Sequence, residues 1–260
     1  MLTCSPTPIA TRHAPTVCMP PKANTDFDGR TSQHIADVLN LLRDAVAPQR
    51  RIVHAGEAIY KAGDGFGHLY ILNSGFCKIV NQTADGREQV VGLKFRGDWM
   101  GFDGIANGRF VCDAIALDTG EVWVIPYDAL MAACARHIKL LSVLHEAMSR
   151  EIARDRDSLM SVCTLPADAR VADFLRYWAH CLGRSGMRAD QFTLRLTRAD
   201  IGNYLGMTIE TVSRSLTRLA RGKLIQFAEK GRRDIHIPEM AALTNFVQSY
   251  LTPPPAAVLH

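Results

Sequence analysis

Residues 197–218, with the sequence TRADIGNYLGMTIETVSRSLTR, constrain the fold of this chain most, because they predict two short helices joined at a tight corner. Thr197 is placed to cap the first helix, and Asp200 three residues later favours the positive end of the helix dipole. Gly206 is expected to end that helix, and Thr208 to cap the next one. A helical hairpin buried in a core would show the same caps, so the neighbouring sequence has to decide between the two.

The second of these helices has two different faces. Val212, Leu216 and Leu219 share the side that packs inward, at the spacing of an amphipathic helix. Polar side chains on the other side suit the base edges in a nucleic acid groove, which is the arrangement of a helix-turn-helix. The outward residues are Glu210, Thr211, Ser213, Arg214 and Arg218.

The charge of the neighbouring sequence favours the nucleic acid interpretation. From residue 166 to the end there are 13 Lys and Arg against 8 Asp and Glu, whereas residues 1–165 carry 17 against 18. The positive charge therefore belongs to the C-terminal part, and it flanks the second helix. A solvated basic face is the ordinary alternative, but phosphate contacts explain this clustering better.

Two short apolar runs follow the second helix, LIQF at 224–227 and DIHI at 234–237. Polar and basic residues between them predict a β-hairpin with a basic tip, so the segment is expected to be a winged helix-turn-helix. We expect DNA contacts from Thr197, Thr208, Glu210, Thr211, Ser213, Arg214, Arg218, Lys230 and Arg232.

The middle of the chain has a different pattern. Residues 51–126 contain short β-rich runs separated by Gly and Asp at intervals near ten residues, which is typical of a β-barrel or jelly roll. A single amphipathic helix, 32–46, precedes them. We predict an α+β chain with a flexible arm at 1–30, a β-barrel domain at 31–135, a dimerisation helix at 136–164, the winged helix-turn-helix at 165–250 and a tail at 251–260.

A long helical stretch spans 138–162, with apolar residues at alternating spacings of three and four. A helix buried in a core would explain the stripe, but the opposite face is strongly charged, which favours a two-stranded coiled coil. Asp155 interrupts the stripe and would face its own symmetry mate, which weakens the pairing. The expected seam consists of Leu141, Leu144, Met148, Ile152, Asp155, Leu159 and Val162.

Bulk properties narrow the class of protein. No stretch approaches the roughly 20 apolar residues of a membrane helix, and the N-terminus lacks the apolar core of a secretory signal, so we expect no membrane partner and a cytoplasmic location. The seven cysteines are odd in number and scattered, unlike a disulfide framework. No nucleophile, base and acid set appears, which argues against an enzyme.

The order of barrel, long helix and winged helix-turn-helix resembles the Crp/Fnr family of bacterial transcription regulators. The stretch DIGNYLGMTIETVSR is very similar to the Fnr-type signature, and GDWMGFDGIANG resembles the Fnr-type barrel segment. The resemblance implies that Glu210, Ser213 and Arg214 read bases in a site of the TTGAT-N4-ATCAA kind. The chemistry agrees, since Arg bridges guanine acceptors and Glu accepts from a cytosine amino group.

The resemblance also implies partners. It implies a homodimer that binds a DNA palindrome and acts as an activator, with RNA polymerase contacted through exposed barrel loops such as 84–88. The residues themselves do not distinguish an activator from a repressor. It further implies that Asp155 occupies the position at which a charge keeps an Fnr-type dimer weak until the sensor engages. A plain solvated turn at 84–88 and a plain surface charge at 155 are the alternatives.

The sequence departs from the family's known sensors. The N-terminal region has only Cys4 and Cys18, and Trp123 stands where the family's barrel cysteine lies, so no Fnr-type iron–sulfur cluster is expected. The places of the cyclic AMP contacts hold Gly101-Phe102 and Val111-Cys112, so cyclic AMP is not expected either. Haem stays open because of His54, His68, His137 and His145.

Residues 164–166 are expected to end the long helix and form a hinge to the DNA-binding part. Two cysteines are candidate redox sensors, because a thiol near arginine is more readily ionised: Cys163 beside this hinge and Cys181 in the next helix. Cys77 and Cys112 are expected to be core thiols. The resulting hypothesis is a cofactor-free, FixK-like regulator of oxygen-limited or nitrogen-oxide-linked metabolism. The rival hypothesis is a ligand- or haem-binding sensor whose DNA binding is gated by the bound molecule.

Overall fold

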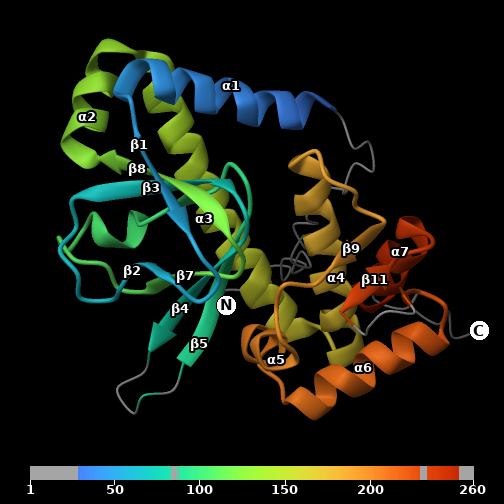
Figure 1. Ribbon diagram of the computed structural model, residues 1–260. Helices are drawn as coiled ribbons and strands as arrows, with labels where there is room; N and C mark the ends of the chain where they lie inside the picture. Colours follow the sequence, from blue (N-terminus) through green and yellow to red (C-terminus); the bar gives the residue numbers. More distant parts are fainter. Residues whose placement is uncertain (1–28, 83–85, 87, 229–232, 252–260) are drawn as a thin grey trace, which may run out of the picture.

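The computed structural model describes residues 29–82, 86, 88–228 and 233–251 (Figure 1). The strands of the first half form a barrel beside a mainly helical C-terminal part, and a long helix, α3, passes between them. The helices are α1 (Gly29–Val46), α2 (Tyr127–Arg136), α3 (Ile138–Thr164), α4 (Ala167–Arg184), α5 (Arg198–Leu205), α6 (Ile209–Arg221) and α7 (Met240–Leu251), with a 3-10 turn η1 (Phe102–Gly104).

The barrel consists of two antiparallel four-stranded sheets, with the strand orders β1-β8-β3-β6 and β2-β7-β4-β5. The β-rich runs of the sequence all form strands, and the expected α+β jelly-roll class is confirmed. Strand β6 was not predicted, because its two residues are too few to show the alternating pattern of a strand. The strands are β1 (Gln49–Val53), β2 (Ala58–Tyr60), β3 (His68–Ser74), β4 (Cys77–Gln82), β5 (Glu88–Lys94), β6 (Trp99–Met100), β7 (Asp113–Ala116) and β8 (Gly120–Pro126).

Helices α1, α2 and the first half of α3 share a core with one barrel sheet. This arrangement corrects the expected dimer seam. Leu144 is 5% exposed and packs into this core, while Leu141 and Met148 are half-buried against it. Leu144 was therefore wrongly assigned to the seam, because the apolar stripe of α3 serves its own barrel in the first half. The helix α2, which was not predicted, supplies part of that core.

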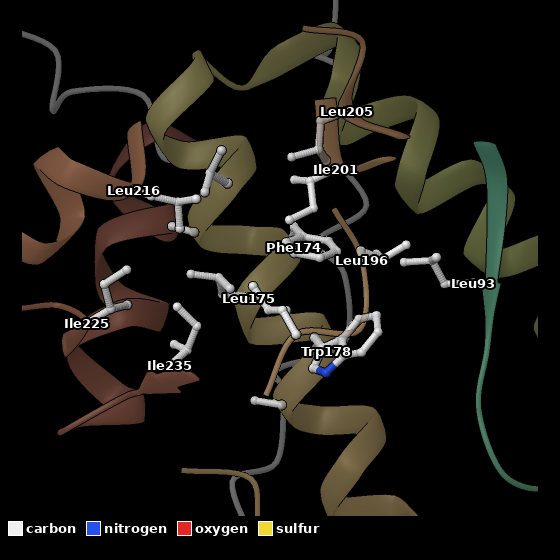
Figure 2. Close-up of a cluster of buried hydrophobic side chains, with 14 of the residues drawn as sticks. Leu93, Phe174, Leu175, Trp178, Leu196, Ile201, Leu205, Leu216, Ile225 and Ile235 are labelled. Atoms are coloured by element: carbon white, nitrogen blue, oxygen red, sulfur yellow. The ribbon is translucent and has the colours of Figure 1, made fainter. Parts of the chain in front are cut away.

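The C-terminal part contains α4, α5, α6 and α7 around a small antiparallel sheet of order β10-β11-β9. The expected wing is present as the hairpin of β10 (Gln226–Phe227) and β11 (Asp234–His236), to which β9 (Gln191–Thr193) adds a third strand. Strand β9 and helix α7 were not predicted. Figure 2 shows the core of this part, which gathers around Phe174, Leu175 and Trp178 of α4.

The same core continues into the barrel. Leu93 and Phe95, at the end of β5, belong to the cluster that holds α4, and Figure 2 shows Leu93 reaching toward it. Phe76 stacks on Trp178 with ring centroids 5.5 Å apart, and Phe95 meets the same indole edge-on at 5.0 Å. The sequence predicted only a hinge at 164–166 between the two parts. The two parts are instead docked on each other through a continuous apolar interface.

Among the helices of the described ranges, none is both long and apolar enough to cross a bilayer.

Candidate nucleic-acid interface

Helix α5 begins with a complete capping box. The Thr197 hydroxyl accepts a hydrogen bond from the Asp200 backbone N–H at 3.0 Å, and the Asp200 carboxylate accepts one from the Thr197 backbone N–H at 3.0 Å. These bonds satisfy two N–H groups that a helix end otherwise leaves without partners. The sequence signal at 197–200 therefore correctly located the start of the first helix.

Two glycines set the corner between α5 and α6. Gly206 ends α5 in the left-handed region, with φ 64°, which glycine adopts without steric cost. Gly202 lies inside α5, and a Cβ built there would lie 2.6 Å from the Met207 carbonyl oxygen. The two helices meet this closely only because residue 202 has no side chain. Sequence reasoning missed Gly202, although a glycine inside a helical pattern is a signal of close packing.

Helix α6 begins at a Thr208 cap, whose hydroxyl accepts a hydrogen bond from the Thr211 backbone N–H at 3.3 Å. Its inward side is buried as expected: Val212, Leu216 and Leu219 are at most 2% exposed. Hydrogen bonds from its own backbone N–H and from Thr208 lower the pKa of Glu210. The carboxylate at the start of the helix is therefore charged at neutral pH and available as an acceptor.

The outward side of α6 presents the residues expected to read bases. Glu210 and Arg214 are exposed, and Ser213 is half-buried beside them. Ile209, which the sequence analysis did not single out, adds an apolar side chain that is 48% exposed at the same end of the helix. Such a set offers an acceptor, a bidentate donor, a hydroxyl and an apolar contact, the four kinds of group that distinguish base edges in the major groove.

Arg218 is exposed, and it also has a partner within the chain that the sequence did not indicate. Its guanidinium forms a bidentate ion pair with Asp168 of α4, at 2.6 and 2.5 Å, and also donates to the Ser215 hydroxyl at 3.2 Å. This side chain therefore holds α6 against α4, and its expected contact with DNA stays a prediction. Asp168 was missed because the pair joins residues 50 positions apart, which no local pattern reveals.

Only some of the basic residues around α6 lie within the described part of the chain. Arg221, Lys223 and Arg233 are exposed near α6 and the wing. The expected contacts Lys230 and Arg232 lie at the hairpin tip, outside the described residues.

The second half of α3 leaves an apolar stripe uncovered. Ile152 is 50% exposed and Leu159 is 64% exposed, with Asp155 exposed between them and Val162 half-buried beyond. These four residues keep the alternating spacing of a coiled-coil seam. Exposed large apolar side chains along one helix face are typical of protein–protein contact surfaces.

Buried ion pairs hold α3 to the barrel. Arg154 donates to Asp98 at 2.8 Å, and Lys94 forms an ion pair with Glu151. Burial alone would raise the pKa of Asp98, but the charge and the hydrogen bond of Arg154 outweigh burial and lower it. Lys94 is only 4% exposed, so removal of Glu151 would leave the lysine charge poorly solvated.

The two candidate redox cysteines have different environments. Cys163 is exposed at the end of α3. Cys181 is 2% exposed in the core of α4, and burial raises the pKa of its thiol to about 12. The prediction of a reactive thiol at 181 is wrong, because desolvation outweighs the nearby arginines. Cys77 is buried and Cys112 half-buried in the barrel, as expected of structural thiols.

A cavity of about 600 Å³ lies between the barrel and α3. Its described wall carries the carboxylates of Asp103, Glu151 and Asp155, and its basic residue, Lys94, is bonded to Glu151. These residues do not fit a cyclic nucleotide, because the anionic phosphate would meet carboxylates without a free cation. The remaining lining is largely apolar, from Tyr60, Ile79, Met100, Phe102, Leu159 and Val162.

The possible metal or haem ligands are dispersed. Across the described ranges, no three His, Cys, Asp or Glu side chains come together as a metal site, and Cys4 and Cys18 lie outside those ranges. Trp123, at the place of the family's barrel cysteine, is 4% exposed and donates to Glu121 at 2.7 Å. The histidines His54, His68, His137 and His145 are all exposed.

Comparisons with known proteins agree with this geometry. Residues 50–137 match the cyclic nucleotide-binding domain, and residues 169–246 match the Crp-like helix-turn-helix domain. The fumarate and nitrate reduction regulatory protein of Yersinia pestis is 35% identical over 187 residues, covering 72% of this chain and 75% of that protein. Electron transport regulator A of Shewanella oneidensis is 36% identical over 187 residues, covering 72% and 75%.

A solved structure has the same architecture. FixK2 from Bradyrhizobium japonicum matches with a TM-score of 0.67 and 25% identity, covering 80% of this chain and 99% of that one. The relatives are transcription regulators and not enzymes. The capped helix pair, the wing and these matches together show that the chain belongs to the Crp/Fnr family of DNA-binding transcription regulators.

Proposed function

We propose that this protein is a homodimeric regulator that binds a palindrome of the TTGAT-N4-ATCAA kind through the exposed side of α6. The observation that carries the proposal is the set of Glu210, Ser213 and Arg214 at the start of a helix whose other side is buried. Nothing else in the described chain covers this set. Each well-placed base contact contributes about 1–3 kcal/mol of discrimination, enough for sequence-specific binding when two copies act together.

The exposed half of the α3 stripe supports the dimer. Ile152, Leu159 and Val162 provide the apolar contacts, and Asp155 places a like charge at the centre of the pairing. Two chains joined there would carry two recognition helices to successive major grooves, about 34 Å apart. Asp155 then serves as the residue that keeps the dimer weak until a signal favours it.

We further propose control of oxygen-limited or nitrogen-oxide-linked metabolism, in the activating direction, through contact with RNA polymerase. The support is the names of the relatives, a fumarate and nitrate reduction regulator and an electron transport regulator. The 84–88 hairpin proposed for the polymerase contact lies mostly outside the described residues. Buried Trp123 supports a regulator that works without an Fnr-type iron–sulfur cluster.

Gel-shift titration with the purified full-length chain tests the DNA-binding proposal. The probes are a duplex with the palindrome and one of the same composition in scrambled order. We expect the palindrome to bind about 1,000-fold more tightly at physiological salt, with two chains per duplex by sedimentation. Equal affinity for the two duplexes, or one chain per duplex, would refute it.

A second candidate function is a ligand-gated regulator, favoured by the cavity between the barrel and α3, because its wall includes Asp155 and Leu159 of the proposed seam. An absorption spectrum of anaerobically purified protein separates the two. A Soret band or a broad visible band supports the ligand-gated form, and a bare protein spectrum supports the cofactor-free regulator.

A further inference from the structure

Strand β5 contacts two distant helices at its two ends. At its last residue, Lys94 pairs with Glu151 of α3, the helix that carries the proposed dimer seam. Near its start, the strand touches α5, the helix directly before the recognition helix (Figure 1). The strand therefore connects the place where two chains would meet to the place where DNA would be read.

In the contact with α5, one side chain takes the place of a neighbouring strand. β5 is the outer strand of its sheet, so one row of its backbone groups faces away from β4. Asn203 fills this position: its amide oxygen accepts from the Val90 N–H at 2.5 Å, and its amide nitrogen donates to the Glu88 carbonyl at 2.6 Å. An added strand would offer the same donor and acceptor to residues two apart.

Further contacts strengthen this joint. Gln89 donates to the backbone carbonyl of Asn203, so three consecutive residues of β5 bind one residue of α5. One turn earlier, Lys78 of β4 pairs with Asp200 at 2.6 Å, and both side chains are less than one-fifth exposed. Burial alone would raise the pKa of Asp200, but hydrogen bonds from Lys78 and Thr197 outweigh it and lower the pKa.

The joint leaves the recognition surface free. Asn203 and Asp200 lie on the side of α5 that faces the barrel, whereas Glu210 and Arg214 of α6 are exposed. The close approach at Gly202 ties α5 firmly to the start of α6. Movement of α6 relative to α3 therefore requires the Asn203 joint to break.

We propose that β5 is a strut that sets the position of each recognition helix relative to the dimer helix, and that Asn203 is the positioning residue of that strut. This inference rests on the proposed binding of a palindrome by a dimer. Two half-site contacts reinforce each other only when their separation matches the DNA, so a rigid strut raises affinity for one spacing and lowers it for others.

The test uses full-length protein with Asn203→Ala, and Asn245→Ala as the control, an exposed asparagine of α7 in the same part of the chain. The probes are a single half-site duplex and palindromes whose spacers have 3, 4 or 5 base pairs. For Asn203→Ala we expect half-site affinity within about twofold of wild type. Affinity for the palindrome with the 4-base-pair spacer should fall about tenfold. The ratio of that affinity to the affinities for the other two spacers should become smaller. The control should match wild type.

The outcomes separate the two proposals. If wild type shows no preference for any palindrome, the proposed function fails. If wild type prefers one spacer and Asn203→Ala keeps the same preference, the strut alone fails. An equal loss of affinity for the half-site and the palindrome also overturns the strut, because it indicates general damage to the recognition helix. A gain in palindrome affinity overturns it too, because it indicates an inhibitory contact. Should Asn203→Ala misfold by circular dichroism, Lys78→Met loosens the same joint from the barrel side and gives the same readout.

Discussion

Substitution of Gly202 by alanine should destabilise the helix-turn-helix, against the usual effect of that exchange. In an ordinary helix interior, Gly→Ala stabilises by about 1 kcal/mol, because it restricts the unfolded chain. At this site the new Cβ would lie 2.6 Å from the Met207 carbonyl oxygen, and 3.5 Å from a Val212 methyl group. The obstructing atom belongs to the backbone, so it cannot rotate away and the two helices must separate.

The magnitude follows from these two opposing terms. Overpacking of this kind costs about 1–3 kcal/mol, and more when backbone has to move. Because backbone has to move here, we take the upper part of that range, about 2–3 kcal/mol, and subtract about 1 kcal/mol for helix propensity. We therefore expect a net loss of about 1–2 kcal/mol in the free energy of unfolding. Separation of α5 and α6 also turns Glu210 and Arg214 away from the groove, so affinity for the palindrome should fall about tenfold or more.

Urea unfolding followed by circular dichroism, together with gel-shift titration, measures both effects. Gly222→Ala is the control, because Gly222 directly follows α6 with φ −75°, and its nearest neighbours are 3.4 Å or more from a built Cβ. The control should be neutral within about 0.5 kcal/mol. A Gly202→Ala variant that is as stable as wild type or more stable, with unchanged DNA affinity, would show that the close approach does not shape the corner.

Three other variants test the reading surface, the seam and the barrel contact. Arg214→Ala should cost about 1–3 kcal/mol of binding at one base pair, measured on single-substituted duplexes, whereas a uniform loss over all sequences would indicate a phosphate contact. Asp155→Ala should tighten the dimer in sedimentation while Asp157→Ala, on the same helix, should not, and an unchanged equilibrium in both would remove the seam charge from regulation. Asp98→Ala should cost about 3–5 kcal/mol, because it leaves Arg154 unpaired in a partly buried site. The pKa of the Asp98 carboxyl is lowered in the folded protein, so the pair contributes its full stability above the ordinary pKa of aspartate. That contribution is lost as pH falls through the lowered pKa. A free energy of unfolding that does not change with pH in this acid range, measured by urea unfolding, would contradict this.

The parts of the fold that follow local patterns were predictable. The caps at Thr197 and Thr208, the buried side of α6 and the wing hairpin all match the structure, because each depends on residues within about ten positions of one another. The elements β6 and β9 were missed because two or three residues carry no detectable period. The first half of the expected seam packs within the chain, and the second half stays a prediction, because periodicity does not tell a neighbour within the chain from another chain.

The sequence by itself determined the two capped helices and the polar side of α6, because capping and amphipathicity are properties of short segments. Only the tertiary structure decided that Arg218 binds Asp168, that Cys181 is buried beyond reaction, and that Asn203 completes the outer edge of β5. Each of these depends on residues 50 or more positions apart, or on the desolvation that packing creates. Features that depend on neighbouring residues could therefore be predicted from the sequence, whereas contacts between residues far apart in the chain required the tertiary structure.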